Sequence, residues 1–395
     1  MGGTKAKGRN LTMEKLRVMS VFGPRPEAIK MAPLVLELKK HPEIESICCV
    51  TAQHRQMLDS VMEVFGLQAD CDLNIMTPRQ TLSDITCKCL TGMDAVIEEQ
   101  KPDLILVHGD TSTTFAGALS AFYHQVPVGH VEAGLRTYDR YSPFPEEMNR
   151  KMVGAIAALH FCPTENNRRN LEKENITEGV FVTGNTVIDA LKTTVQADYH
   201  FATEELNTLP YGEKKVILVT CHRRENYGQP MEDIMAALAH IARTHSEVEL
   251  VYPVHLSPVV QEVAHRHLDG IQNVHLVAPL AADEMHNLMS RCYLVMTDSG
   301  GLQEEAPSLG KPVLVLRRET ERPEAVAAGT VKLAGVNYEE IIRMAEELIE
   351  DDVAYAAMAH AVNPYGDGHA CRRIAEGILW HFGRLDHCPE DYCGA

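Results

Sequence analysis

Short runs of β-branched and other apolar residues alternate along this chain with longer stretches in which apolar positions recur at helical spacing. The longer stretches predict amphipathic helices over residues 27–40, 82–100, 231–244 and 282–290. Strands and helices that alternate in this way are typical of parallel sheets covered by helices on both faces. The predicted strands cover residues 17–22, 46–51, 104–108, 126–130, 180–183, 215–220, 248–252, 274–277, 293–296 and 313–316.

The chain divides into two predicted α/β halves. The segment 189–213 is polar, lacks a strong strand pattern and contains Pro210 and Gly212, which predicts a linker. A length of 395 residues, more than one hydrophobic core usually serves, also favours two domains. We expect two Rossmann-like, doubly wound domains facing a cleft. The expected ranges are 1–14 for a flexible extension, 15–195 for the N-terminal domain, 205–363 for the C-terminal domain and 365–385 for a final helix that rejoins the N-terminal domain.

Composition excludes several kinds of partner. Thirty-seven Lys and Arg against 55 Asp and Glu give a formal charge of −18, which argues against non-specific binding to nucleic acid or to an anionic membrane. No apolar run reaches the roughly 18 residues of a membrane span. The eleven cysteines are odd in number and form no CxxC pair, so we expect reduced thiols and a cytoplasmic protein. A solvated tail is favoured over a metal site for His381, His387, Cys388 and Cys393.

The segment Thr297–Val326, TDSGGLQEEAPSLGKPVLVLRRETERPEAV, follows a predicted buried strand and continues as a helix. The Ser-Gly-Gly at 299–301 would leave backbone N–H groups free at the positive end of that helix, which suits a phosphate. Glu305, about one turn further, could reach the hydroxyls of an attached ribose. An ordinary strand–turn–helix is the alternative, but Glu305 and Arg322 together favour a nucleotide diphosphate site.

Charged side chains follow the strands of the first half. Arg25 lies three residues after the end of the first predicted strand. It is either a residue that binds a phosphate or an ordinary surface arginine. Asp110, Glu132 and Glu146 follow later strands, and each alone reads as an N-cap or a solvated acid. Because ligands of parallel sheets bind beyond the carboxyl ends of the strands, we expect the set to line one cleft. Clustered carboxylates in a partly dry site raise one another's proton affinity, which suits acid and base catalysis.

A basic cluster follows a strand of the second half. His222 and Arg223, within the sequence CHRREN, could neutralise a departing diphosphate, and a protonated His222 could donate to it. The alternative is a salt-bridge cluster that caps a helix. His255, taken alone, reads as structural. No G-x-G-x-x-G follows a strand and no G-x-x-x-x-G-K-[ST] is present, so we expect neither NAD nor ATP chemistry and no cofactor.

Taken together, these clusters resemble one family over about residues 17–380, the bacterial non-hydrolysing UDP-N-acetylglucosamine 2-epimerases. The motifs that carry the resemblance run in order along the chain: FGPRPEAIKMAPL, TAQHRQMLD, DLNIM, VHGDT, PVGHVEAGLRT, YSPFPEEMNR, PTE, GNTVIDAL, CHRREN, VYPVH, TDSGGLQEEAPSLGKPVLVLR, ERPEAV and NPYGDG.

The resemblance implies a GT-B fold, a homodimer and a reaction that interconverts UDP-GlcNAc and UDP-ManNAc without NAD or metal. UDP leaves C1 as a proton leaves C2, a bound glycal forms, and UDP adds back while C2 is protonated on the opposite face. The product would supply ManNAc for cell-surface polysaccharide. Which carboxylate serves which face is left open by the sequence.

Three sets of positions match functional positions of the family. The catalytic set is Asp110, Glu132, Glu146 and His222. The substrate-binding set is Arg25, Lys30, Asp110, Glu132, His222, Leu280, Met285, Ser299, Gly300, Gly301, Glu305 and Arg322. A set that the family uses to bind UDP-GlcNAc as an allosteric activator is Gln53, Gln56, Arg79, Glu146, Arg223 and His255.

The chain departs from the family pattern at three positions, none of which removes a charged group. Pro24 stands where Thr is usual, Cys221 replaces a Gly before His222, and Met285 stands where an aromatic residue often lies near the uracil. Two other functions remain open on the sequence, a GT-B glycosyltransferase and a non-catalytic sensor of UDP-sugars. If the protein closes on its substrate, hinges near Pro210 and Asn363 are expected.

Overall fold

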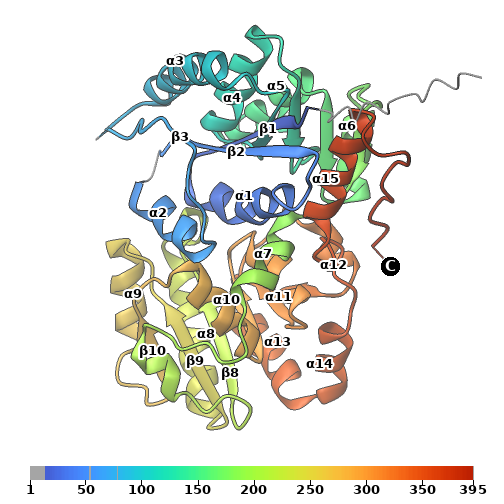
Figure 1. The fold of residues 1–395 in the computed structure, drawn as a ribbon. Coiled ribbons are helices and arrows are strands. Elements are labelled where there is room, and N and C mark those ends of the chain that lie inside the picture. The colour runs from blue at the N-terminus through green and yellow to red at the C-terminus, as the bar shows by residue number, and fades with distance from the viewer. Residues whose placement is uncertain (1–13, 53–54, 78, 395) are drawn as a thin grey trace, which may run out of the picture.

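The computed structural model describes residues 14–52, 55–77 and 79–394. Two parallel sheets organise the chain, with strand orders β3-β2-β1-β4-β5-β6-β7 and β10-β9-β8-β11-β12-β13. Figure 1 shows the first sheet with its helices above the second. The strands are β1 Leu16–Phe22, β2 Ile44–Val50, β3 Cys71–Asp72, β4 Leu104–His108, β5 Val128–Val131, β6 Leu159–Cys162, β7 Val180–Val182, β8 Lys215–Thr220, β9 Val248–Pro253, β10 Val274–Val277, β11 Leu294–Thr297, β12 Val313–Val315 and β13 Val331–Leu333.

Helices pack on both faces of each sheet because both faces of the strands are apolar. In β1, Val18 and Phe22 join a core with α1, α2 and α15, whereas Met19 and Val21 join a core with α3, α4 and α5. Within the described ranges, no helix has the length and apolar content needed to cross a membrane. The helices are α1 Arg25–Leu38, α2 Arg55–Val64, α3 Leu82–Gln100, α4 Ser112–Tyr123, α5 Glu146–Ile156, α6 Glu165–Glu172, α7 Thr186–Thr194, α8 Gln229–Thr244, α9 Pro258–Leu268, α10 Ala282–Arg291, α11 Leu302–Ser308, α12 Pro323–Ala327, α13 Tyr338–Glu350, α14 Asp352–Ala359 and α15 Ala370–His381, with 3₁₀ turns η1 Glu204–Thr208 and η2 Arg224–Asn226.

The predicted fold class, two Rossmann-like α/β sheets with flanking helices, is confirmed. Every predicted strand forms, with ends shifted by one or two residues. Three strands were not predicted, namely β3, β6 and β13, which are two to four residues long. Periodicity carries little information over so few residues, and the Ala-rich sequence before β6 continues the helical pattern of α5.

Each sheet has one switch point, where the order of strands reverses. In the first sheet it lies between β1 and β4, and in the second between β8 and β11. A crevice opens beyond the carboxyl ends of the strands at such a point, and ligands bind there. The loops that leave these four strands begin at Gly23, Gly109, Cys221 and Asp298. They carry Asp110, His222, Arg223 and the turn at Ser299–Gly301, whereas Glu132 and Arg322 follow other strands.

The predicted linker over 189–213 is wrong for its middle part. Phe201, Leu206 and Leu209 are buried in one core with strands of the second sheet. Their apolar side chains fasten this segment to the second half, so the stretch before Pro210 does not run free between the halves. The hinge expected near Pro210 therefore lies on the body of the second half.

Helix α7 lies between the two halves (Figure 1). Its Asp189 accepts hydrogen bonds from the backbone N–H groups of Ala370 and Cys371, at the start of α15. At its other end, the hydroxyl of Thr194 lies 2.7 Å from Nδ1 of His286 on α10. Because α7 is held by both halves, the exact domain boundary stays a prediction.

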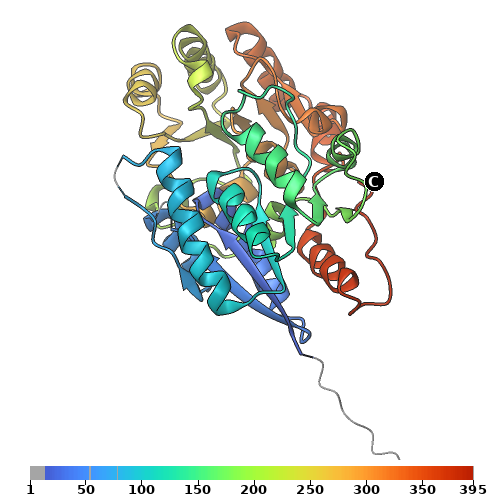
Figure 2. The ribbon, with the colours of Figure 1, turned by 90° about the horizontal axis from the view of Figure 1, so that it is seen from above.

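The end of the chain returns to the first sheet. Figure 2 shows α15 and the following tail beside the strands at the β7 edge. Asp391 accepts a hydrogen bond from the N–H of Val182 in β7, and Tyr392 donates its own N–H to the Val182 carbonyl at 2.7 Å. The Tyr392 hydroxyl donates to the carbonyl of Asn363 at 2.6 Å. The four residues expected in a solvated tail, His381, His387, Cys388 and Cys393, are exposed, while Asp391 and Tyr392 fasten the tail to β7.

Gly134, in the loop after β5, provides a test of this packing. Its φ is +87°, and an added Cβ would lie 2.3 Å from the carbonyl oxygen of Asn167 on α6. Gly66 also has a positive φ, +62°, but nothing lies within 4 Å of an added Cβ. We expect Gly66→Ala to cost about 1 kcal/mol through the backbone alone, and Gly134→Ala to cost clearly more because α6 must move. Urea denaturation of both variants measures this, and equal losses would contradict the packing described.

Candidate active site

Arg25 reaches from the first half of the chain to the second. It is the first residue of α1, and its guanidinium donates to the carbonyl of Leu280 at 3.2 Å, just before α10. Burial lowers the pKa of Arg25, and the charges of Asp283 and Glu305 oppose that shift. Arg25 therefore brings a positive charge to the boundary between the halves, next to two of the predicted substrate-binding residues, Leu280 and Glu305.

Lys30 and Glu132 form a buried ion pair inside the first half. Glu132 follows β5 with a φ of 62°, a strained conformation for this residue type and one that clusters at functional sites. Burial opposes ionisation of Glu132, but the charges of Lys30, His108 and Arg322 hold its pKa well below the usual range. The expectation that neighbouring carboxylates raise the proton affinity of Glu132 is therefore wrong, since its neighbours are mainly cations.

One side-chain amide joins this pair to the second half. Asn185, the N-cap of α7, accepts from the N–H of Val187 through its carbonyl oxygen, which turns its NH₂ group into the cleft. That group donates to Glu132 at 3.0 Å and to Glu304 of α11 at 2.6 Å. Arg322 then donates its Nε–H to the other oxygen of Glu304 at 2.6 Å. Lys30, Glu132, Asn185, Glu304 and Arg322 thus form one continuous network, which we call the bridging network.

Asp110 is paired with a different cation. Its carboxylate lies 2.5 Å from a guanidinium nitrogen of Arg150 on α5, and Asn149 donates to its backbone carbonyl at 2.8 Å. Glu146 begins the same helix, one turn before Arg150. An added Cβ on Gly109 would lie 3.8 Å from Glu132, which places the Asp110 loop beside Glu132. Asp110 and Glu132 therefore lie near each other, each paired with its own cation, while Glu146 lies one helical turn from the cation of Asp110.

His222 is oriented by Asp298. This fully buried carboxylate accepts backbone N–H groups from His222 and Arg223, both at 2.8 Å, and its other oxygen lies 3.5 Å from His222 Nδ1. The His222 ring stacks on His255, with centroids 5.2 Å apart. Burial, with the charges of His255 and Arg223, lowers the pKa of His222 despite Asp298. The free protein therefore favours a neutral imidazole, so His222 could donate to a departing diphosphate only after it gains a proton.

The glycines of the turn at 299–301 make room for charged side chains. An added Cβ on Gly300 would lie 3.4 Å from the guanidinium carbon of Arg322, and one on Gly301 would lie 3.1 Å from Glu305. The other Glu305 oxygen lies 3.4 Å from His286. The N–H of Ser299 donates to the Thr297 hydroxyl, so this one donor of the turn is engaged within the turn itself.

Two of the residues predicted to bind an activator border the same region. His255 stacks on His222, and the N–H of Arg223 is held by Asp298. Arg79 is exposed, with a φ of 59°. Gln53 and the side chain of Gln56 lie outside the described residues.

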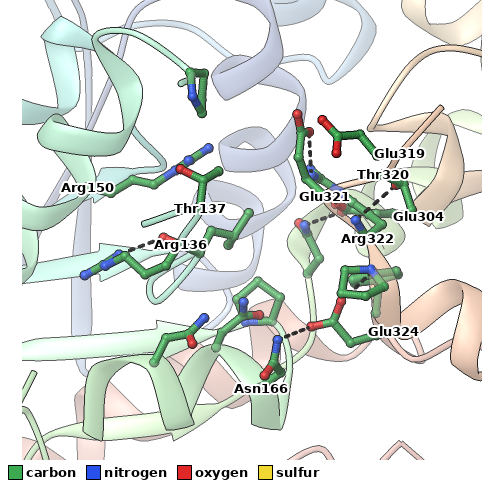
Figure 3. A pocket seen from close by; sticks show the side chains of 18 of the residues that line it. Arg136, Thr137, Arg150, Asn166, Glu304, Glu319, Thr320, Glu321, Arg322 and Glu324 are labelled. Carbon is green, nitrogen blue, oxygen red and sulfur yellow. Dashed lines mark hydrogen bonds and ion pairs between the residues drawn. The ribbon is translucent and has the colours of Figure 1, made fainter. Parts of the chain in front are cut away.

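A cavity of about 450 Å³ lies between the halves beside the bridging network. Figure 3 shows Arg150 of the first half across the cavity from Glu304, Arg322 and their neighbours of the second half, whereas the Arg136 guanidinium points away from them and pairs with Glu174. On its floor, Asn166 of α6 donates to Glu324 of α12 at 2.9 Å, which links the halves a second time (Figure 3). Most of its lining was not predicted from the sequence.

Comparison with known proteins decides the family. The family model described as UDP-N-acetylglucosamine 2-epimerase matches residues 36–379. UDP-N-acetylglucosamine 2-epimerase of Bacillus subtilis is 57% identical over 97% of this chain and 100% of its own length. That of Escherichia coli K12 is 53% identical over 92% and 98%. A crystal structure of UDP-GlcNAc 2-epimerase from Neisseria meningitidis matches with a TM-score of 0.85 at 49% identity, over 92% of this chain and 100% of that one.

This chain belongs to the UDP-N-acetylglucosamine 2-epimerase family. The predicted resemblance to the non-hydrolysing epimerases, the assignment as an enzyme of that class and the GT-B arrangement are confirmed.

Four residues that organise the site of this epimerase were not predicted, namely Asn185, Asp298, Glu304 and Arg150. Asn185 stands in the motif GNTVIDAL, just before a helical pattern. Because Asn is a favoured N-cap residue, the sequence could have predicted its position at the start of a helix. Asp298 precedes the Ser-Gly-Gly turn, and its burial depends on β8 lying beside β11. Such pairing across the sheet cannot be read from residue spacing.

The ion pair between Arg322 and Glu304 can be tested by substitution. Arg322→Met leaves Glu304, 2% exposed, buried without its cation. We expect a loss of about 3–5 kcal/mol in the free energy of unfolding, measured by urea denaturation. The matched control is Arg343→Met, which removes an arginine from an exposed pair with Glu340 on α13 and should change stability little. Similar stability in the two variants would show that the bridging network does not stabilise the fold.

Proposed function

We propose that this protein interconverts UDP-GlcNAc and UDP-ManNAc by eliminating UDP from C1 and adding it back. The observation that carries the proposal is the bridging network, because it joins Glu132, a carboxylate suited to proton transfer at C2, with Arg322, which lies beside the turn suited to holding a diphosphate. The Neisseria meningitidis structure, which is bound to UDP-GlcNAc, supports the choice of substrate. A complete cycle needs the proton-transferring carboxylate and the diphosphate-binding turn at the same time, since UDP must stay bound while it is not covalently attached.

Carboxylates of the first half of the chain are proposed to carry out the elimination step. A carboxylate removes the proton at C2, the C2–H electrons form a C1=C2 bond, and the C1–O bond breaks toward UDP. The low pKa of Glu132 keeps it ionised, as a base requires. Return of UDP to C1 then accompanies delivery of a proton to the opposite face of C2. Asp110 and Glu146 are the candidates for that face, and which carboxylate serves which face stays open.

Residues of the second half, together with Arg25, are proposed to retain UDP. Arg25, Arg322 and the turn at Ser299–Gly301 bring positive charge and N–H groups toward one region. A neutral His222 beside a bound diphosphate would gain proton affinity, because nearby negative charge raises the pKa of an imidazole. It could then protonate the departing phosphate and take the proton back. Glu305 is proposed to bind the ribose, and Leu280 and Met285 to contact the uracil.

The oligomeric state, the location in the cell, the use of the product and the regulation are proposed from the family. We propose a homodimer in the cytoplasm that supplies ManNAc for cell-surface polysaccharide and is activated when a second UDP-GlcNAc binds. The proposed activator residues are Gln53, Gln56, Arg79, Glu146, Arg223 and His255. All eleven cysteines lie in the described ranges and are free, which fits a reducing compartment.

The reaction is tested by incubating UDP-GlcNAc with the protein in D₂O. We expect deuterium at C2 and a mixture with UDP-ManNAc, since the proton lost to solvent is replaced on return. Glu132→Gln should lower the rate by about 10²–10⁴-fold, the usual contribution of a positioned acid or base. Glu340→Gln, on the solvent-facing side of α13, is the control and should leave the rate unchanged.

Other outcomes of that assay separate the alternatives. Release of free ManNAc and UDP without re-addition would indicate a hydrolysing enzyme. UDP released only when an acceptor is added would indicate a glycosyltransferase. Tight binding without exchange at C2 would indicate a sensor.

The activator site is tested separately by steady-state kinetics. If it operates, the rate rises sigmoidally with UDP-GlcNAc concentration. Arg79→Ala should then make the curve hyperbolic, because Arg79 belongs to the activator set alone. Lys88→Ala, on neighbouring α3, is the control. A sigmoidal curve that survives Arg79→Ala would count against this site.

A further inference from the structure

Glu27 is a buried acid that the proposed reaction does not use. It lies in the first turn of α1, between Arg25 and Lys30, and is 3% exposed. Such burial removes it from contact with a substrate. A carboxyl group buried without an ion pair is costly unless its oxygens are hydrogen-bonded or it is neutral.

The carboxyl group of Glu27 joins two loops of the switch point. Its Oε2 accepts from the N–H of Gly23, in the turn after β1, at 2.8 Å. Its Oε1 contacts the hydroxyl of Thr111 and lies 3.0 Å from the hydroxyl of Thr114. Thr111 directly follows Asp110 and caps α4. The loop that presents Arg25 is thus tied to the loop that presents Asp110.

The number of protons available for the hydrogen bonds around Glu27 favours its neutral form. The Thr114 hydroxyl oxygen also lies 2.5 Å from the carbonyl oxygen of His108, which can only accept, so the Thr114 proton is used there. If Glu27 were ionised, the 3.0 Å contact between its Oε1 and Thr114 would hold no proton. If Oε1 carries the proton, it donates to Thr114, while the Thr111 proton still points to Glu27. The contacts of Glu27 are then all satisfied, and only the 3.2 Å approach of the Thr111 and Thr114 hydroxyls to each other holds no proton.

The electrostatic surroundings agree with this count. Burial raises the pKa of Glu27 to about 7, against the effect of its hydrogen bonds, and the charge of Asp110 adds to the rise. Cys89 faces it from α3, and burial raises the pKa of that thiol to about 11, which leaves it neutral. On its own helix, Lys30 is engaged with Glu132 and Arg25 reaches Leu280.

We propose that Glu27 is a positioning residue, whose neutral carboxyl group holds the Arg25 and Asp110 loops in register for catalysis. The inference rests on the proposed reaction for its effect on rate. The protonation of Glu27 does not rest on that reaction, because it follows from contacts within the first half.

Stability against pH tests the protonation directly. A carboxyl group whose pKa rises from 4.5 to about 7 on folding makes the native protein lose stability as pH rises across that window, and no further above it. Glu27→Gln resembles the neutral acid, since its amide can accept from Gly23 and donate to Thr114, while the Thr111 hydroxyl turns its proton to the Thr114 oxygen, 3.2 Å away. The Tm of the variant, relative to the Tm of the natural protein, should therefore rise as the pH increases from 4.5 to 7. Above pH 7 the difference in Tm should stay constant.

A matched control should show the opposite sign. Burial acts against ionisation of Glu249, but Lys214 and His275 hold the pKa of Glu249 below its usual value. Glu249→Gln should therefore lose stability relative to the natural protein as pH rises through the acid range. A Tm difference for Glu27→Gln that is independent of pH, or that follows Glu249→Gln, would overturn the proposal.

Activity tests the positioning role. Glu27→Ala should lower kcat by about 10²-fold, the effect of a misplaced catalytic group. Glu27→Gln should recover most of that loss and should flatten the fall in kcat that the natural protein shows as Glu27 ionises near pH 7. A Glu27→Gln variant as inactive as Glu27→Ala would overturn the role. If the natural protein shows no exchange at C2, the proposed reaction fails, whereas the Tm profile still decides the protonation of Glu27.

Discussion

Two buried carboxylates, held together by one amide, are the constraint on which the site depends. Glu132 and Glu304 come from different halves of the chain and would repel each other in a dry environment. Asn185 donates to both, while Lys30 and Arg322 supply one positive charge each. The set is therefore balanced in charge, which a buried ionic network requires. Any opening of the cleft that separates the two carboxylates must break a hydrogen bond of Asn185.

The two switch points divide the chemistry of the protein. Beyond β1 and β4 lie Arg25, Glu27 and Asp110, and beyond β8 and β11 lie His222 and Asp298. In both halves a buried acid organises the loops, and in neither is it among the residues expected to touch the substrate. Asp298 collects the N–H groups of the His222 loop, as Glu27 collects donors from two loops. Buried acids of this kind fix geometry because leaving any of their partners unpaired is costly.

The sequence predicted the fold and the location of the site well, because both follow from where apolar runs end. Asp110, Glu132 and His222 each come directly after a strand, and parallel sheets bring such positions together. Protonation states were harder to predict. The low pKa of Glu132 depends on Lys30, about a hundred residues away in sequence, and the lowered pKa of His222 depends on burial. The segment 199–211 was missed because its few apolar residues, such as Phe201 and Leu206, are diluted by polar ones.

The tail that follows α15 has a consequence for how copies of this protein meet. β7 is the last strand of the first sheet, and an uncovered edge strand offers its N–H and C=O groups to any extended chain nearby. Asp391 and Tyr392 occupy both groups of Val182, so the chain blocks its own edge against intermolecular pairing. Fusing a partner at this end, or trimming it, would therefore expose the edge of β7 to pairing with another chain.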